Sequence, residues 1–128
     1  MKKIYVAGAM SGTELEYLRN LRKGIRLSLN VLQAGFCPFS PFIDYPFFLA
    51  LREDEEITGE QIKAYSLEWL EVCDAILLVP GWENSKGTLA EIKKAEELGI
   101  PIFTTLTSLI EHFENYSIGA SIGSGASE

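Results

Sequence analysis

The sequence has few of the residues from which metal sites and disulfide frameworks are built. Its 128 residues include two cysteines, Cys37 and Cys73, and one histidine, His112. Zinc sites draw most of their three or four protein ligands from these residue types, so the sequence predicts no metal site. Each cysteine lies beside apolar residues, and we expect both to be buried free thiols in a reducing cytoplasm.

Long apolar runs are also absent. No segment reaches the roughly 18 consecutive apolar residues of a membrane-spanning helix, so we expect no contact with a membrane. The chain enters a predicted strand at Lys3, and the apolar run there is too short for a secretory signal peptide. These features predict a cytoplasmic protein.

Positive charge is scarce. The chain has 11 Lys and Arg against 18 Asp and Glu, which gives a formal net charge of −7 and a pI of about 4.7. Because there is no basic stripe to neutralise phosphates, we do not expect the chain to bind a nucleic-acid polymer. A single small phosphate is compatible with this charge, since backbone N–H groups can bind it.

The chain does contain enough apolar material for one core. It is 47% hydrophobic, and predicted apolar strands alternate with amphipathic helices, which is the pattern of an α/β protein. We expect a flavodoxin- or Rossmann-like three-layer sandwich with a four- or five-stranded parallel sheet, formed by residues 1–116. Residues 117–128 are rich in Gly and Ser and predict a flexible tail.

The first long helix is expected from Glu14 to Ala34. Its apolar residues recur at helical spacing and predict a stripe of the kind that packs against a core. This stripe consists of Leu15, Leu18, Leu21, Ile25, Leu29 and Leu32.

The most informative stretch runs from Asp74 to Phe103 and has the pattern strand, loop, helix, turn and strand. Residues 75–79 form an apolar run suited to a strand buried on both faces, and Pro80 and Gly81 end it. A polar loop continues to Gly87. Because this loop leaves the carboxyl end of a parallel strand, it lies where open α/β sheets bind ligands.

A helix is expected to begin at Thr88, because Thr88 and Glu91 match a capping box. Gly99 is expected to end it. Similar boxes are predicted at Thr13/Glu16, Thr58/Gln61 and Ser108/Glu111. The capping role by itself would explain a glutamate at position 91.

The spacing Ser85-x-Gly87-x-x-x-Glu91 gives the same stretch a second interpretation. Glycine lets backbone N–H groups approach a ligand closely, and a helix N-terminus favours an anion. A carboxylate one turn into the helix faces the same cleft. The segment is therefore suited to hold a phosphate or a sugar hydroxyl and to present Glu91 to the adjacent carbon.

The segment from Phe39 to Leu51 is strongly aromatic. We interpret it as a wall that stacks on a nucleobase, or as a lid or subunit contact, and the two are compatible. Asp44, its single charged residue, is either a turn cap beside Pro46 or a contact to the base. Because the segment is more apolar than the surface of a small monomer, we expect a homodimer or a higher homo-oligomer.

The loop from Pro80 to Ser85, together with Gly87 and Glu91, resembles that of the nucleoside 2-deoxyribosyltransferase family and its relatives, the 2′-deoxynucleoside 5′-monophosphate N-glycosidases. The segment from Tyr5 to Gly12, YVAGAMSG, matches the first loop of the same family. The resemblance implies N-glycosidic bond cleavage or deoxyribosyl transfer on a small deoxynucleoside or its 5′-monophosphate. It implies no cofactor.

By this resemblance Glu91 is the nucleophile that attacks C1′ of the sugar. Tyr5 is either a core aromatic of the first strand or a phenol beside that nucleophile. Ser85 stands where the monophosphate hydrolases have a serine that contacts phosphate, which favours a 5′-monophosphate substrate. The other implied substrate contacts are Gly8, Met10, Ser11, Gly12, Trp82 and Gly87.

The chain departs from the family at Ser66. Relatives have an aspartate there that positions and protonates the leaving base. Ser66 can hydrogen-bond a base and stays a candidate catalytic residue, but a serine is no carboxylic acid near neutral pH. Either Asp44 or Glu68 then takes that role, or cleavage is weak or lost. The alternative function is a non-catalytic nucleotide-binding module, similar to TIR- or SLOG-like domains, that binds or sequesters a nucleotide.

Overall fold

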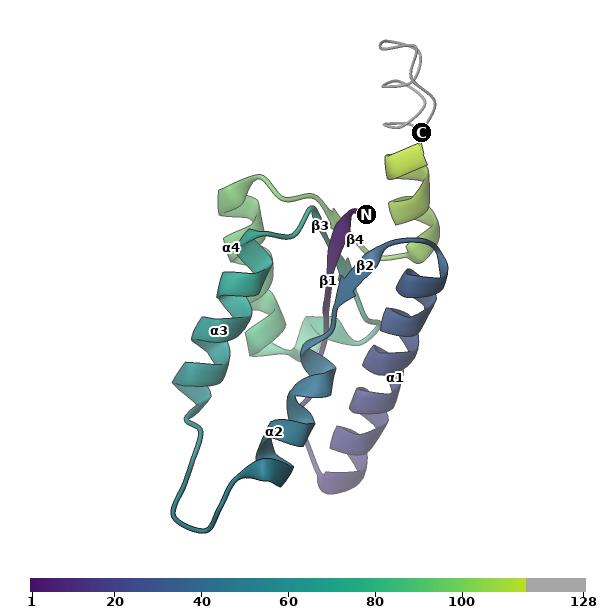
Figure 1. The fold of residues 1–128 in the computed structure, drawn as a ribbon. Coiled ribbons are helices and arrows are strands. Elements are labelled where there is room, and N and C mark those ends of the chain that lie inside the picture. Colours follow the sequence, from purple (N-terminus) through teal and green to yellow (C-terminus); the bar gives the residue numbers. More distant parts are fainter. Residues whose placement is uncertain (115–128) are drawn as a thin grey trace.

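A computed structural model describes residues 1–114, which form one sheet with helices on both faces (Figure 1). Within these residues the sheet has four parallel strands, β1 (Lys3–Ala7), β2 (Cys37–Phe39), β3 (Ala75–Leu78) and β4 (Ile102–Phe103). Their order is β2-β1-β3-β4, so β1 and β3 are central. The predicted α/β fold with a parallel sheet is confirmed. The tail predicted at 117–128 lies outside the described residues.

The strands are connected by the helices α1 (Glu14–Gln33), α2 (Tyr45–Ala50), α3 (Gly59–Glu71) and α4 (Lys86–Leu98). Two 3-10 turns, η1 (Pro41–Asp44) and η2 (Trp82–Asn84), follow β2 and β3. A further helical segment runs from residue 106 to residue 114, where the described part of the chain ends. Among the described helices, none is long and apolar enough to cross a membrane.

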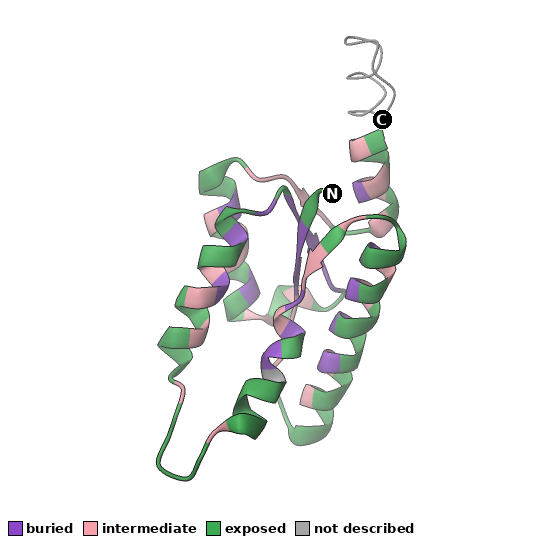
Figure 2. Ribbon diagram, viewed as in Figure 1, coloured by how far each residue is buried: buried purple, intermediate pink, exposed green. Residues whose placement is uncertain are grey.

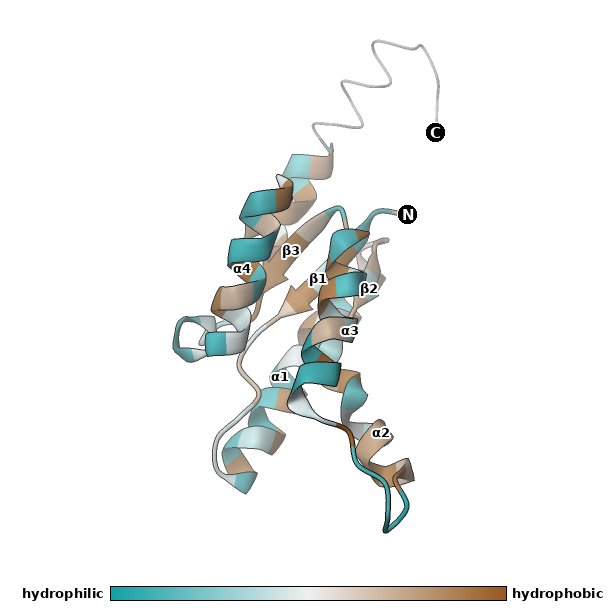
Figure 3. Cartoon of the chain, turned by 90° about the vertical axis from the view of Figure 1, so that its left-hand side faces the viewer, coloured by the Kyte–Doolittle hydropathy of each residue, from teal (hydrophilic) through white to brown (hydrophobic). Residues whose placement is uncertain are grey.

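The core has two layers because successive residues of a strand face opposite sides of the sheet. Figure 2 shows that the buried residues concentrate on the central strands, and Figure 3 shows that those strands are hydrophobic. The layer beneath α1 and the segment 106–114 contains Ile4, Val6, Leu21, Val31, Ala75, Leu77 and Leu109. The layer beneath α3 and α4 contains Tyr5, Ala7, Leu70, Ile76, Leu78 and Ala95.

Helix α1 does not bury the apolar stripe that its sequence predicts. Of that stripe only Leu21 is buried, and the other five members are exposed to between 40% and 57%. The face turned to the core has Leu21, Gly24, Ser28 and Val31. Small residues are needed there because the ring of Phe42 packs on Gly24, where a Cβ would lie 2.3 Å from the ring carbons. Close approach of Phe42 therefore decides which face of α1 is buried.

Two of the predicted helix starts are wrong by one turn. Helix α4 is capped by Ser85, whose Oγ accepts from the Thr88 backbone N–H at 3.1 Å. The last helical segment is capped by Thr105, whose Oγ1 accepts from the Ser108 N–H at 3.1 Å. In both, a second serine or threonine precedes the predicted cap by three residues, and the earlier residue begins the helix. The boxes at Thr13/Glu16 and Thr58/Gln61 are confirmed.

The two cysteines differ in environment. Both are free thiols, as predicted, but only Cys73 is buried. Cys37 is exposed, which contradicts the prediction, because it lies on β2 at the edge of the sheet. His112 is exposed, and its ring packs beside Phe103 and Phe113.

Candidate active site

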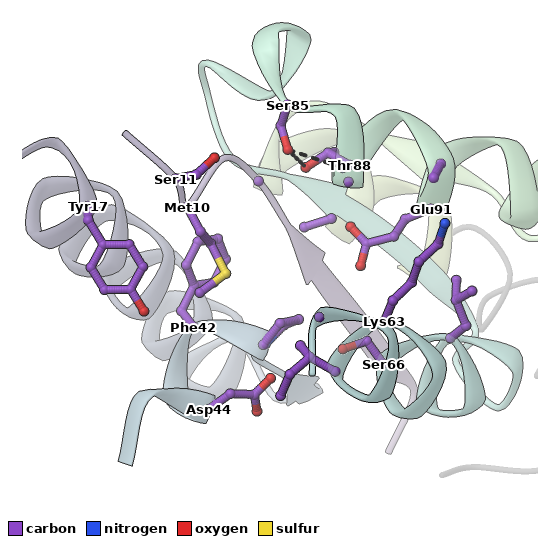
Figure 4. Close-up of a pocket in the computed structure, with 18 of the residues that line it drawn as sticks. Met10, Ser11, Tyr17, Phe42, Asp44, Lys63, Ser66, Ser85, Thr88 and Glu91 are labelled. Carbon is purple, nitrogen blue, oxygen red and sulfur yellow. Dashed lines mark hydrogen bonds between the residues drawn. The ribbon is translucent and has the colours of Figure 1, made fainter. Parts of the chain in front are cut away.

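A cavity of about 380 Å³ opens where the carboxyl ends of the parallel strands meet the first turns of the helices. Its walls come from the end of β1 and the turn after it, from η1 and α2, from α3 and from the start of α4 (Figure 4). This is the edge at which open α/β sheets bind ligands. The volume falls in the range of roughly 300–1,000 Å³ typical of small-molecule sites.

The carboxylate of Glu91 projects into this cavity from α4 (Figure 4). The hydroxyl of Tyr5, which is fully buried on β1, donates a hydrogen bond to Oε2 of Glu91. Burial raises the pKa of the Glu91 carboxyl from 4.5 to about 7, although the hydrogen bond from Tyr5 acts in the opposite direction. Burial first, and then the charge of Glu91, raise the pKa of the Tyr5 phenol far above its ordinary value.

Glu91 has no part in capping its helix. Ser85 is the cap, so Thr88 is the third helical residue and Glu91 the sixth. The prediction of a Thr88/Glu91 capping box is therefore wrong. Helix capping therefore does not explain why a glutamate stands at position 91. The side chain contacts Tyr5 within the cavity instead.

The N-terminus of α4 forms a second side of the cavity. The Ser85 hydroxyl accepts from the Thr88 N–H at 3.1 Å and from the Thr88 hydroxyl at 3.0 Å, so its own proton remains for donation to a ligand. The N–H groups of Lys86 and Gly87 precede the first intrahelical bonds and have no acceptor within the helix. A Cβ at Gly87 would meet only Ser85 Oγ, at 3.9 Å. This end of the cavity presents donors and space to an anion.

Asp44 lies on the side of the cavity opposite Ser85 and Thr88 (Figure 4). Its side chain is 6% exposed, and Oδ1 accepts a hydrogen bond from the hydroxyl of Tyr65 on α3. Burial raises the pKa of the Asp44 carboxyl, and the hydrogen bond from Tyr65 opposes that change. Asp44 precedes α2 but makes no capping hydrogen bond with its side chain. The interpretation of Asp44 as a turn cap is therefore wrong.

Most residues singled out from the sequence lie around this cavity. The lining includes Gly8, Met10, Ser11, Asp44, Ser66, Ser85, Gly87 and Glu91. Tyr5 donates a hydrogen bond to Glu91 from β1, and Ser66 is buried near Tyr5. Gly12 and Trp82 are outside the lining: Gly12 has a φ of 148° in the turn before α1, and Trp82 packs against the core layer beneath α3 and α4. Glu68 is exposed on α3, away from the cavity.

Several other lining residues were not predicted from the sequence. Lys63 is the only Lys or Arg that lines the cavity within residues 1–114, and it lies on α3 three residues before Ser66. That spacing places both on one helix face and is a signal that could have been used. Phe42 and Phe48 also line the cavity. The aromatic segment from Phe39 to Leu51 predicted an aromatic wall without indicating which of its rings would face the ligand.

Comparison with known proteins places the chain in a family. The sequence profile of the domain of unknown function DUF4406 matches residues 2–104. The chain belongs to this family. DUF4406 is in turn a family of the nucleoside 2-deoxyribosyltransferase superfamily, so the resemblance recognised in the sequence is confirmed. A search of curated proteins found no match.

Solved structures share the fold of this DUF4406 protein. A conserved protein from Enterococcus faecalis V583 superposes with a TM-score of 0.58 at 21% identity, over 80% of this chain and 61% of that one. The 2-deoxyribosyltransferase of Bacillus psychrosaccharolyticus superposes with a TM-score of 0.54 at 23% identity, over 78% of this chain and 69% of that one. The 2-deoxyribosyltransferase of Leishmania mexicana superposes with a TM-score of 0.54 at 18% identity, over 80% of this chain and 62% of that one. The chain therefore spans about three fifths of the length of the first of these proteins.

Proposed function

We propose that this protein cleaves the N-glycosidic bond of 2′-deoxynucleosides or their 5′-monophosphates, with Glu91 as the nucleophile. The observation that carries the proposal is the environment of Glu91. The carboxylate is released from any capping role, is directed into a cavity and is held by the phenol of Tyr5. The family and the fold shared with 2-deoxyribosyltransferases support the same reaction class.

The proposed chemistry has two steps, each of which exchanges one bond at C1′ of the sugar. The free oxygen of the Glu91 carboxylate attacks C1′, the C1′–N bond breaks, and its electron pair leaves with the base. Tyr5 holds Oε2, which orients the carboxylate for this attack. Water or a second base then attacks C1′ and releases Glu91 as a carboxylate. The first acceptor gives hydrolysis, the second gives deoxyribosyl transfer.

The donor-rich end of the cavity supports a 5′-monophosphate as substrate. The Ser85 hydroxyl and the free N–H groups at the start of α4 suit a phosphate, and a serine does not repel the phosphate charge as a carboxylate would. Lys63 on the facing helix adds a positive charge to the lining. A small organic anion is therefore the ligand class that this surface fits best.

Release of free base from deoxynucleotides tests the proposal. Wild-type protein is incubated with each 2′-deoxynucleoside 5′-monophosphate, and the base is separated by chromatography. We expect Glu91→Gln to abolish release while nucleotide binding persists, because the amide has no anionic oxygen for the attack. Glu97→Gln, an exposed glutamate on the same helix, is the matched control and should behave as wild type. Base release by Glu91→Gln at the wild-type rate would refute the nucleophile assignment.

Ser66 supports a second candidate function. The base side of the cavity has a buried hydroxyl where relatives carry an acid, and a hydroxyl protonates a leaving base poorly. A protein of this kind would bind a nucleotide without cleaving it. Tight binding by the wild-type protein without release of any base would favour this function over cleavage.

A further inference from the structure

The cavity has two chemically different ends. Ser85 and Gly87 present hydrogen-bond donors at the start of α4, whereas the carboxylate of Asp44 lies on the opposite side of the cavity (Figure 4). The lining also includes the rings of Phe42 and Phe48. A phosphate is attracted to the donors and repelled by a carboxylate. A nucleotide bound in this cavity is therefore oriented with its phosphate at α4 and its base at Asp44.

Asp44 is a buried hydrogen-bond acceptor that the protein satisfies only in part. Oδ1 accepts from the Tyr65 hydroxyl, and among the described residues no side chain forms an ion pair with Asp44. An ionised carboxylate has about four lone-pair sites and no donor. Burial raises the pKa of the Asp44 carboxyl, and the hydrogen bond from Tyr65 acts against that rise. The remaining lone pairs of the carboxylate can therefore accept a hydrogen bond from a donor on the ligand.

Asp44 and the proposed nucleophile share one cavity. Both Asp44 and Glu91 are part of its lining, and Tyr5 donates a hydrogen bond to Glu91. A nucleotide bound in this cavity therefore has both carboxylates beside it.

We propose that Asp44, positioned by Tyr65, reads the base and selects nucleotides whose base presents an exocyclic amino group to the cavity. This assignment rests on the proposed function in that the ligand is a deoxynucleotide. An amino group donates into the open lone pairs of Asp44. A base with an oxo group at the same place brings a second acceptor against the carboxylate, which is repulsive.

Two substrate pairs test this contact. dAMP and dIMP differ by amino against oxo at C6, and the adjacent N1 changes with it from an acceptor to an N–H donor. dCMP and dUMP differ in the same way at C4 and N3. Affinities are measured by titration calorimetry with the full chain carrying Glu91→Gln, so that no nucleotide is consumed. We expect the amino member of at least one pair to bind tenfold or more tighter than its oxo partner.

The variant Asp44→Asn tests the residue. Its amide offers a donor as well as an acceptor, so we expect the amino-to-oxo affinity ratio to fall about tenfold. Asp54→Asn, which removes the same charge from an exposed loop, should leave the ratio unchanged. If Asp44→Asn does not fold, Tyr65→Phe carries the test, because it frees the carboxylate to turn and should lower the ratio several-fold.

The outcomes separate this inference from the proposed function. A ratio near one with Asp44 intact, or an unchanged ratio in a folded Asp44→Asn or Tyr65→Phe variant, overturns the role of Asp44. Wild-type protein that shows the ratio but releases no base overturns the cleavage proposal and leaves the base contact standing. No binding of any of the four nucleotides overturns both the base contact and the choice of a 5′-monophosphate as substrate.

Discussion

Burial of the Glu91 carboxylate costs the folded protein stability. A side chain at the surface of α4 would ionise freely, but this one is turned into a cavity and held by Tyr5. Because burial opposes the charged form, its pKa rises to about 7. A carboxylate of this kind is less solvated, and therefore more reactive, than an exposed one.

The raised pKa predicts how stability depends on pH. The folded protein binds the Glu91 proton more tightly than the unfolded chain, so this group stabilises the fold at low pH and the effect is lost as pH rises from 4.5 through about 7. The variant Glu91→Gln has no carboxyl group to titrate at this position. Its free energy of unfolding, measured by urea denaturation, should match that of the wild type near pH 4.5 and exceed it at pH 8 by on the order of 3 kcal/mol. A difference between the two proteins that does not vary with pH would contradict the raised pKa.

At the scale of elements, the start of α4 determines the character of the cavity. The helix begins one turn earlier than the capping pattern predicts, and this places Gly87 in its first turn with free N–H groups beside it. No packing within the protein requires a glycine there, since a Cβ would meet nothing closer than 3.9 Å. We therefore expect the glycine at position 87 to serve ligand binding rather than packing within the protein.

The variant Gly87→Ala should separate binding from stability. Alanine is a better helix former than glycine, so we expect the free energy of unfolding to rise by about 0.5–1 kcal/mol. The added methyl group occupies the cavity wall beside the free N–H groups, so affinity for dAMP should fall tenfold or more. Both quantities are measured on the same protein, by urea denaturation and calorimetry. Unchanged affinity would show that no anion binds at this turn.

At the scale of the whole molecule, two apolar surfaces are exposed within residues 1–114. Five large aliphatic residues on α1 are exposed at spacings of three, four or seven residues. Ile43, Phe47 and Leu49 are exposed to between 51% and 71% around α2, near the cavity. Such surfaces are typical of contacts between proteins. The expectation of a homo-oligomer, made from the aromatic segment around α2, stays a prediction.

We predict that the protein forms at least a dimer and that α1 supplies the contact. An antiparallel copy would set Leu15 opposite Leu32 and Leu18 opposite Leu29, as in paired amphipathic helices. Leu18→Glu with Leu29→Glu should give a monomer in light scattering at micromolar concentration. Leu98→Glu, an exposed leucine on α4, is the control. A wild-type monomer would refute association, and a dimer that survives the α1 substitutions would move the contact to another face.

The sequence by itself determined the elements that depend on local chemistry. Apolar runs and the turn residues that end them located β1 and β3, and Gly99 ended α4 as expected, because strand burial and glycine in a left-handed conformation are properties of a few adjacent residues. The loop around Ser85 and Gly87 identified the superfamily for the same reason.

Only the tertiary structure decided which side chains meet. It brought Asp44 to Tyr65, 21 residues away, which the sequence had not indicated. It showed that Tyr5 contacts Glu91 across 86 residues, where the family resemblance had left a core role for Tyr5 open. It also turned the small residues of α1 inward, because Phe42 must pack on Gly24, and left the leucines outside. A hydrophobic pattern states which residues favour burial, but the competition among faces for the same core is settled only when the distant partners are in place.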